Sequence, residues 1–322
     1  MINTYQLKQL KLEPILNPAP KGKSKVIALF VLVFLVAALL LSGCQTEGTI
    51  EWEGGTYTGE LYRSEPHGEG VWTHPDGDRM EGEWKEGHLQ GWGTVSLSDG
   101  TDYEGELKNG LMHGEGKVSR ADGTIYEGEF YQGRAHGEGK TINPDGSIYR
   151  GQYEHGQKQG WGEYDLPEDG IHYEGQFADN MFHGYGEMKV EGSFTYEGEF
   201  SEDLFHGYGE MTYTDGMTYR GEFARGLFHG SGEISHPDGV SYRGEFKAGQ
   251  FHGQGTFVSE EGSEYTGEFK DGKYHGTGTI VFEDGTVYEG QWAEGQFYGE
   301  GKLTLPDGEV IEGTFEEHEF VE

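Results

Sequence analysis

The sequence predicts an all-β protein, an elongated, twisted, single-layer antiparallel meander of β-hairpin repeats. Three observations predict it: a motif that recurs about every 23 residues, apolar residues that alternate with polar ones in each copy, and turn residues at two fixed places in each copy. The copies are spaced by 23 residues except for one step of 24, and they open at Tyr57, Met80, Tyr103, Tyr126, Tyr149, Tyr173, Tyr196, Tyr219, Tyr242, Tyr265, Tyr288 and Ile311. Such an array is stabilised by contacts between neighbouring copies rather than by one central core.

Each copy contains two segments with a period of two. In the first, Tyr126, Gly128 and Phe130 point to one side, and Glu127 and Glu129 to the other. The second segment follows a His-Gly-x-Gly motif, and its glycines leave room for the aromatic rings of an adjacent strand. Its next inward position is apolar or aromatic in ten of eleven copies: Trp72, Val95, Val118, Thr141, Tyr164, Met188, Met211, Ile234, Phe257, Ile280 and Leu303. These patterns predict an aromatic inner face.

Two kinds of turn are expected to alternate along the chain. Asp-Gly pairs, such as Asp99-Gly100, are a strong hairpin signal because both residues tolerate positive φ. The other turn carries glycine at one fixed place, as at Gly226, and only Asn180 and Asp203 replace it. Since Asn and Asp tolerate the left-handed region best after glycine, that backbone position is predicted to be left-handed.

The repeated unit resembles the MORN repeat. The family's consensus, roughly YxGxFxxGxxHGxGxxxxxDG, is met at residues 126–146 and 242–262, and the resemblance covers about 265 of 322 residues. It implies a MORN-repeat array over residues 57–322, about twelve copies with the last one partial, and scaffolding or membrane-associated roles. The tail after Phe315 is predicted to cap the last copy. The runner-up fold is a six-bladed propeller with two copies in each four-stranded blade.

The first 44 residues have the features of a bacterial lipoprotein signal. Lysines at 21, 23 and 25 precede an apolar run over residues 26–41, which is shorter than the roughly 20 residues of a usual membrane span. The run ends in Leu-Ser-Gly-Cys, which resembles the lipobox and implies lipid attachment at Cys44. We therefore expect a signal peptide at residues 1–43, lipid attachment and a polar tether at residues 44–56, and a lipid-anchored protein on the extracytoplasmic side of the cell membrane or outer membrane. An uncleaved signal anchor is the alternative.

The charge of the chain limits its ligands. The formal net charge is −35, and the five lysines and one glutamate of residues 1–43 leave 18 basic and 57 acidic side chains after them, a net −39. A body of this charge repels the phosphates of nucleic acids and anionic lipids. We therefore expect no nucleic-acid partner. Membrane headgroup binding, which some members of the family suggest, is an alternative that the charge disfavours.

The sequence predicts no catalytic residue, metal site or cofactor. One histidine recurs at the same place of eight copies, but equivalent positions lie two strands apart, about 9.6 Å, which is too far for a shared metal ion. These residues are His67, His113, His136, His183, His206, His229, His252 and His275. The recurring outward glutamate, such as Glu129 or Glu222, is expected to be solvated. No nucleophile with a paired base and no dinucleotide-binding motif was found.

Aromatic residues interrupt the acidic outer face at four places. Trp92, Trp161, Tyr185 and Tyr208 stand between the paired glycines, at the place that Glu69, Glu115, Glu138 and Glu300 occupy in four other copies. Such side chains can stack on sugars or anchor a protein partner, although strand formation alone also accounts for them.

The leading hypothesis is therefore a non-enzymatic, membrane-anchored scaffold that presents an acidic, extended surface to an unknown protein partner at the cell envelope. A carbohydrate or cell-wall binding protein that uses the four exposed aromatics is the rival from another class. Affinity capture from envelope extracts with residues 45–322 would reduce the uncertainty about the partner most.

Overall fold

The computed structural model describes residues 45–322, so the predicted signal segment and Cys44 lie outside the described residues. The described residues form 25 strands and no helix. No part of residues 45–322 therefore forms a helix that is long and apolar enough to cross a membrane. The array divides into two compact units, an N-terminal unit up to Tyr164 and a C-terminal unit from Asp165, and each is described by itself.

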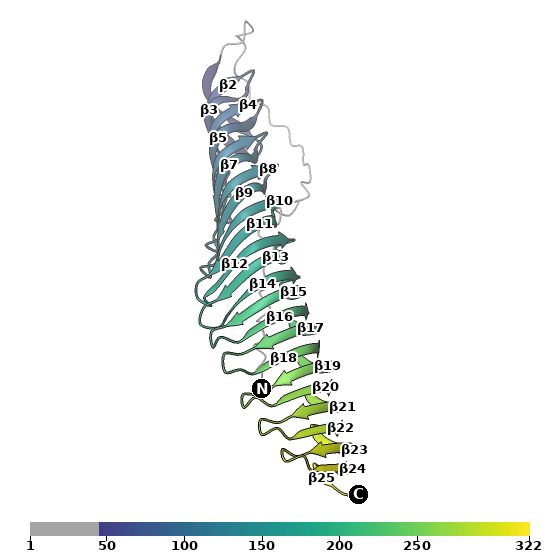
Figure 1. The fold of residues 1–322 in the computed structure, drawn as a ribbon. Coiled ribbons are helices and arrows are strands. Elements are labelled where there is room, and N and C mark those ends of the chain that lie inside the picture. Colours follow the sequence, from purple (N-terminus) through teal and green to yellow (C-terminus); the bar gives the residue numbers. More distant parts are fainter. Residues whose placement is uncertain (1–44) are drawn as a thin grey trace. The chain divides into compact units, whose positions relative to one another are not determined.

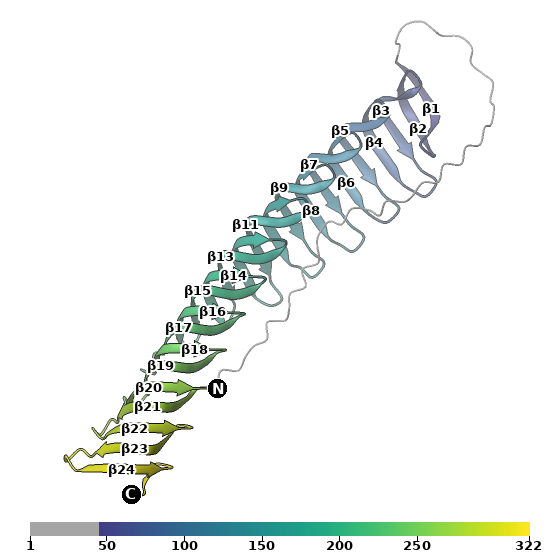
Figure 2. The same cartoon turned by 90° about the vertical axis from the view of Figure 1, so that its right-hand side faces the viewer.

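In the N-terminal unit each strand from β1 to β10 pairs antiparallel with the next strand in the sequence. Figure 2 shows this order. The strands are β1 (Thr46–Trp52), β2 (Gly55–Tyr62), β3 (Glu65–Thr73), β4 (Arg79–Lys85), β5 (His88–Ser96), β6 (Asp102–Lys108), β7 (Leu111–Ser119), β8 (Ile125–Tyr131), β9 (Arg134–Ile142) and β10 (Ile148–Glu154). The unit boundary falls inside β11 (Gln157–Leu166).

The C-terminal unit repeats this arrangement from β12 to β25, again with each strand paired to the next (Figure 1). Its strands are β12 (Ile171–Ala178), β13 (Met181–Val190), β14 (Phe194–Ser201), β15 (Leu204–Tyr213), β16 (Thr218–Ala224), β17 (Leu227–Ser235), β18 (Ser241–Lys247), β19 (Gln250–Val258), β20 (Glu264–Lys270), β21 (Lys273–Val281), β22 (Val287–Ala293), β23 (Gln296–Thr304), β24 (Val310–Glu316) and β25 (Glu319–Phe320). The predicted all-β antiparallel meander of hairpins is confirmed. The propeller alternative is wrong, because pairing continues without a break every four strands.

The inner face is a layer of aromatic rings lying on glycine. Tyr219 is fully buried, and a Cβ atom built on Gly232 of the next strand would lie 2.6 Å from its phenol oxygen. The predicted role of the glycine pairs, to make room for rings, is therefore confirmed. In the C-terminal unit a second ring lies close above each tyrosine, as in the stack of Tyr242 and Phe251 at 3.8 Å between centroids.

The N-terminal unit fills that second ring position with other side chains. Leu89 and Ala135 are buried there. Lys158 is buried as well, and its Nζ lies 4.8 Å from the ring centroid of Tyr149 and 4.9 Å from that of Tyr164. The stacked second ring is thus a feature of the C-terminal unit and does not extend into these repeats.

The two kinds of turn differ from each other in length. In the two-residue turn between β6 and β7, Asn109 has a φ of 53° and Gly110 a φ of 72°, which is the geometry of a type I′ turn. Asn180 and Asp203 take the glycine place with φ of 72° and 64°, so the predicted left-handed position is confirmed. The sequence did not reveal that the residue before it is left-handed too.

The Asp-Gly loops are longer, with five residues between the end of β5 and the start of β6, and the expectation that both residues adopt positive φ is wrong for them. In the loop between β5 and β6, Gly100 has a φ of 84°, whereas Asp99 is not left-handed. Instead the Asp99 carboxylate accepts a hydrogen bond from the Thr101 N–H at 2.9 Å. Aspartate is thus placed there as an acceptor that closes the loop.

In eight of the two-residue hairpins, an outward glutamate or glutamine on the first strand accepts a hydrogen bond from a backbone N–H of the second strand. Between β16 and β17 the register shifts at a bulge after Gly221, Glu222 faces His229, and Gly230 is left-handed with a φ of 56°. The Glu222 Oε1 accepts the N–H of Ser231 at 3.0 Å. The same bond to the backbone is made by Glu129, Glu199, Glu245, Glu268, Gln152, Gln176 and Gln291. These side chains, expected to be solvated, have a structural role.

Both ends of the described array differ from complete copies. Where a polar tether was expected, Thr46–Trp52 forms β1 and pairs with β2, with Ile50 opposite Tyr57. The reason is that these residues alternate like the second segment of a copy but lack its His-Gly motif. At the other end β25 pairs with β24, and Phe320 contacts Phe315 with ring centroids 5.6 Å apart. The tail therefore replaces part of a second strand, as predicted.

Candidate binding surface

The four aromatic residues singled out by the sequence are exposed on the outer face, opposite the buried tyrosines. The exposed fractions are 58% for Trp92 and 51% for Trp161 in the N-terminal unit. They are 49% for Tyr185 and 56% for Tyr208 in the C-terminal unit. Tyr298 is another exposed aromatic residue, with an exposed fraction of 54%, and it was not predicted because it stands where other copies have the recurring histidine.

The two tryptophans do not form a common site. Trp92 lies on β5 and Trp161 on β11, six strands later, which corresponds to about 29 Å at the usual strand spacing. Glu115 and Glu138 occupy the equivalent positions between them. Trp92 is therefore a single aromatic residue, with Glu69 and Glu115 at the equivalent positions before and after it.

The two tyrosines lie much closer together. Tyr185 on β13 and Tyr208 on β15 are two strands apart, about 9.6 Å, and Glu199 on β14 lies opposite Tyr185. The Tyr185 hydroxyl donates a hydrogen bond to the Glu197 carboxylate at 2.5 Å. This bond raises the pKa of Tyr185, because the phenol can donate the hydrogen bond only while it keeps its proton.

Beside these tyrosines runs a row of four glutamates, one on each of four successive strands. Glu174 faces Glu187, Glu187 faces Glu197, and Glu197 faces Glu210 in the register of β12 to β15. Among the described residues, an ion pair reaches this row only at Glu210, whose carboxylate lies 2.8 Å from Arg220. Directly opposed like charges destabilise a sheet, so this row is unfavourable for folding alone.

The corresponding row of the N-terminal unit is built differently. There the facing residues alternate in sign along β6 to β9, in the order Glu104, Lys117, Glu127 and Lys140. Opposite charges across strands stabilise a sheet. The row of four glutamates is therefore a local departure from the charge pattern of the other unit.

The recurring histidines lie along the row of two-residue turns and not around a common centre. His252 Nδ1 is 4.0 Å from Asp271 Oδ1 in the following turn, and the rings of His113 and Tyr131 are 5.4 Å apart. In both cases the histidine contacts a residue in or next to the following two-residue turn.

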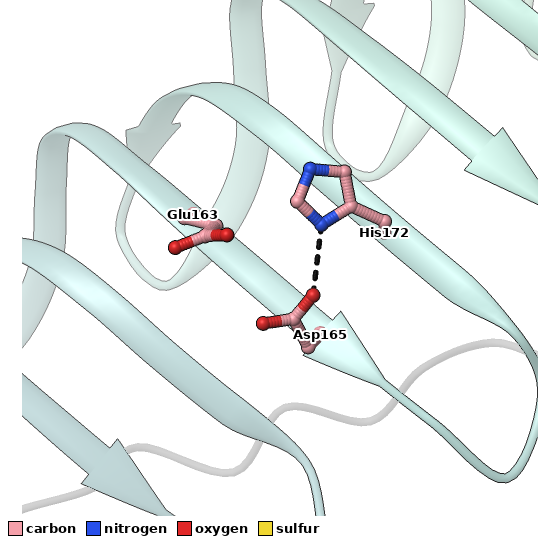
Figure 3. A group of neighbouring side chains, drawn as sticks. All are labelled: Glu163, Asp165 and His172. Atoms are coloured by element: carbon pink, nitrogen blue, oxygen red, sulfur yellow. Dashed lines mark hydrogen bonds and ion pairs between the residues drawn. The ribbon is translucent and has the colours of Figure 1, made fainter.

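A different histidine contacts a carboxylate near the start of the C-terminal unit. His172 Nδ1 lies 2.8 Å from Asp165 Oδ1. Figure 3 shows this pair together with Glu163, which lies two residues before Asp165 on the same strand. The Glu163 carboxylate lies 3.3 Å from the guanidinium of Arg150. His172 falls in the single 24-residue step of the array, so the repeat pattern gave no signal for it. Charge pairing and hydrogen bonding account for these contacts.

The fold and this surface define a β-hairpin repeat protein with an exposed acidic and aromatic face. Ten segments match the model of the MORN repeat: residues 57–79, 81–102, 103–125, 126–148, 173–189, 196–218, 219–241, 242–264, 265–287 and 288–310. The chain therefore belongs to the MORN repeat family. The family is in general non-catalytic, and membership indicates a repeat scaffold for binding.

Several solved structures resemble this chain weakly. The TCP10 domain of Danio rerio CPAP, in complex with a peptide of Danio rerio STIL, is 18% identical, with 75% of this chain and 96% of that chain covered and a TM-score of 0.29. The G-box domain of the microcephaly protein CPAP is 13% identical, with 70% and 100% covered and a TM-score of 0.25. A streptogramin B lyase is 12% identical, with 86% and 85% covered and a TM-score of 0.14. No curated protein matches the chain.

Proposed function

We propose that this MORN-repeat chain is a non-enzymatic scaffold that binds a protein partner through the outer face of its sheet. The main support is that the outer face is exposed and acidic and contains exposed aromatic residues, whereas the aromatic rings of the inner face are buried and pack against one another. Aromatic side chains of this kind are the usual anchors of protein interfaces.

We further propose that the scaffold is lipid-anchored through Cys44 on the extracytoplasmic side of a bacterial membrane. The support comes from the sequence, where basic, apolar and small-residue regions precede the single cysteine in that order. An anchored array would present its partner-binding face next to the membrane while its charge of −39 keeps it from adhering to anionic headgroups.

Site-specific photo-crosslinking in the cells that produce the chain tests the scaffold proposal. A photoreactive amino acid replaces Ser231 on the outer face, and the matched control replaces Ala121 in an Asp-Gly loop. We expect adducts of defined mass from position 231 that are digested by trypsin, and none from position 121. Equal adducts from both positions, or none from position 231, would overturn the proposal.

Carbohydrate binding is the second candidate, because Trp92 and Trp161 expose more than half of their surface. Its test is retention of the full chain on purified cell-wall polysaccharide, with the variant Trp92→Ser/Trp161→Ser beside wild type. Loss of retention in this variant would support this candidate. Equal retention, or no retention of wild type, would rule it out for these residues.

A further inference from the structure

We propose that the outer face of β12 to β15 binds a basic, extended segment of a partner protein, with its Lys or Arg side chains beside Glu174, Glu187 and Glu197 and against the rings of Tyr185 and Tyr208. This inference rests on the proposed scaffold function and names the chemistry of the partner. It concerns residues of the C-terminal unit only.

The two exposed tyrosines provide the first argument. Both rings expose about half of their surface on a sheet face that no described element covers. Aromatic rings attract ammonium and guanidinium groups that lie within about 6 Å of the ring centre. The Tyr185 hydroxyl also donates a hydrogen bond to the Glu197 carboxylate at 2.5 Å, so the ring and the carboxylate are held side by side.

The register provides the second argument. It sets Glu174, Glu187 and Glu197 directly opposite one another on neighbouring strands, and no basic residue separates them. The cations nearest in the pairing scheme are Arg220, which pairs with Glu210, and Lys189, two residues along β13 from Glu187. A basic partner would neutralise this row and remove the repulsion that the sheet carries alone. Charge complementarity therefore favours a cationic occupant over a neutral one.

The spacing of the row matches an extended chain. Four glutamates on successive strands span about 14 Å at 4.8 Å per strand. In an extended peptide, side chains on the same side are about 6.8 Å apart, so three basic residues at alternate positions span about the same distance. The segment would cross the strands of the sheet, with its basic side chains over the row and its backbone beside the tyrosines.

The test measures binding of a fluorescent peptide, Ser-Lys-Ser-Arg-Ser-Lys-Ser, to the full chain by anisotropy at 150 mM salt, with a peptide carrying Gln in place of Lys and Arg as the reference. The main variant is Glu187→Gln/Glu197→Gln, which keeps side-chain volume. The matched control is Glu104→Gln/Glu127→Gln, which removes the same charge from the alternating row of the N-terminal unit.

We expect the main variant to weaken binding of the basic peptide about tenfold and the control to weaken it less than about twofold. Tyr185→Ser/Tyr208→Ser should weaken it as well, while Tyr185→Phe/Tyr208→Phe should retain most of the affinity because the rings remain. Circular dichroism and thermal melting establish that each variant is folded.

An equal loss of affinity for the basic peptide in the main and control variants would overturn the proposal. It would mean that the peptide is attracted by the overall negative charge of the protein and not by this row of glutamates. Failure of wild type to prefer the basic peptide over its Gln reference would overturn it too. Either result would leave the scaffold proposal standing if photo-crosslinking from position 231 still captures a protein.

Discussion

Tyr219 on β16 and Phe228 on β17 stack face to face, with ring centroids 3.7 Å apart and ring planes 10° apart. The Tyr219 hydroxyl also donates a hydrogen bond to the carbonyl of Glu222 at 2.7 Å. One side chain thus joins its own strand, the neighbouring strand and the residue that closes the bulge. Since the stack recurs along the C-terminal unit, much of the packing energy of that unit lies in these paired rings.

Truncation of the stacked ring should destabilise the C-terminal unit. Phe228 is buried, so Phe228→Ala is expected to lower the free energy of unfolding by about 3 to 5 kcal/mol. Phe228→Leu should cost less, because Leu89 fills the equivalent place in the N-terminal unit. Urea denaturation followed by circular dichroism measures the difference. Tyr208→Ser on the outer face is the control, and a loss as large as that of Phe228→Ala would contradict the assignment of the two faces.

The glycine of the two-residue turn should tolerate asparagine and reject β-branched residues. Gly226 has a φ of 77°, and the equivalent residues Asn180 and Asp203 have similar angles. Gly226→Val should therefore cost about 1 to 3 kcal/mol, while Gly226→Asn should be mild. Melting temperatures of the two variants decide the matter. Equal values would mean that the backbone at this position does not require the left-handed region.

The bulge-closing glutamate should be replaceable by glutamine but not by alanine. Glu222 accepts the Ser231 N–H, and Gln152 and Gln291 accept the equivalent N–H groups in their own copies. Glu222→Gln should leave stability nearly unchanged, whereas Glu222→Ala should cost about 1 kcal/mol for the lost acceptor. Hydrogen exchange of the Ser231 amide reports the bond directly. Equal exchange rates in the alanine variant and wild type would show that the carboxylate does not protect this amide.

The buried tyrosines should make the fold sensitive to alkali. Burial raises the pKa of Tyr57 from 10.0 to about 12, and it also raises the pKa of Tyr126 and Tyr219. The pKa of Tyr57 is higher in the folded state than in the unfolded state. Its contribution to stability is therefore fully present below pH 10 and is lost as the pH rises through the folded-state pKa. We therefore expect stability to fall between pH 10 and 12, with unfolding and phenolate absorbance at high pH rising together. Smooth ionisation of all tyrosines near pH 10 without unfolding would contradict the burial.

The sequence predicted the strands well because the signals are local. The alternation around Tyr126 and Phe130 and the glycines of the turns lie within a few residues of one another, and twelve copies repeat them. It failed at β1, where Gly48 and Ile50 keep the alternation but no His-Gly motif announces a strand.

The surface was predictable only in part, because it depends on which residues face each other across strands. Exposure of Tyr185 and Tyr208 followed from their places between glycines. The row of four glutamates did not, since Glu174, Glu187, Glu197 and Glu210 are separated by 10 to 13 residues in the sequence and meet only in the register. The backbone bond of Glu222 needs the bulge, which leaves no mark in the alternation of side chains.

Cys44 lies outside the described residues, so its lipid attachment stays a prediction with a direct test. Cys44→Ser removes the only thiol of the chain. If a lipoprotein peptidase cuts after Gly43, wild type should be found as a shorter, lipid-bearing chain, and the variant should keep residues 1–43 and gain no lipid. Intact-mass measurement and detergent partitioning distinguish the two products, with Ser42→Ala as a control that keeps a small residue at the processing site. If the masses of Cys44→Ser and wild type differ only by the replacement of sulfur with oxygen, and both partition alike, the uncleaved signal anchor is favoured, in which the apolar run over residues 26–41 itself holds the chain at the membrane.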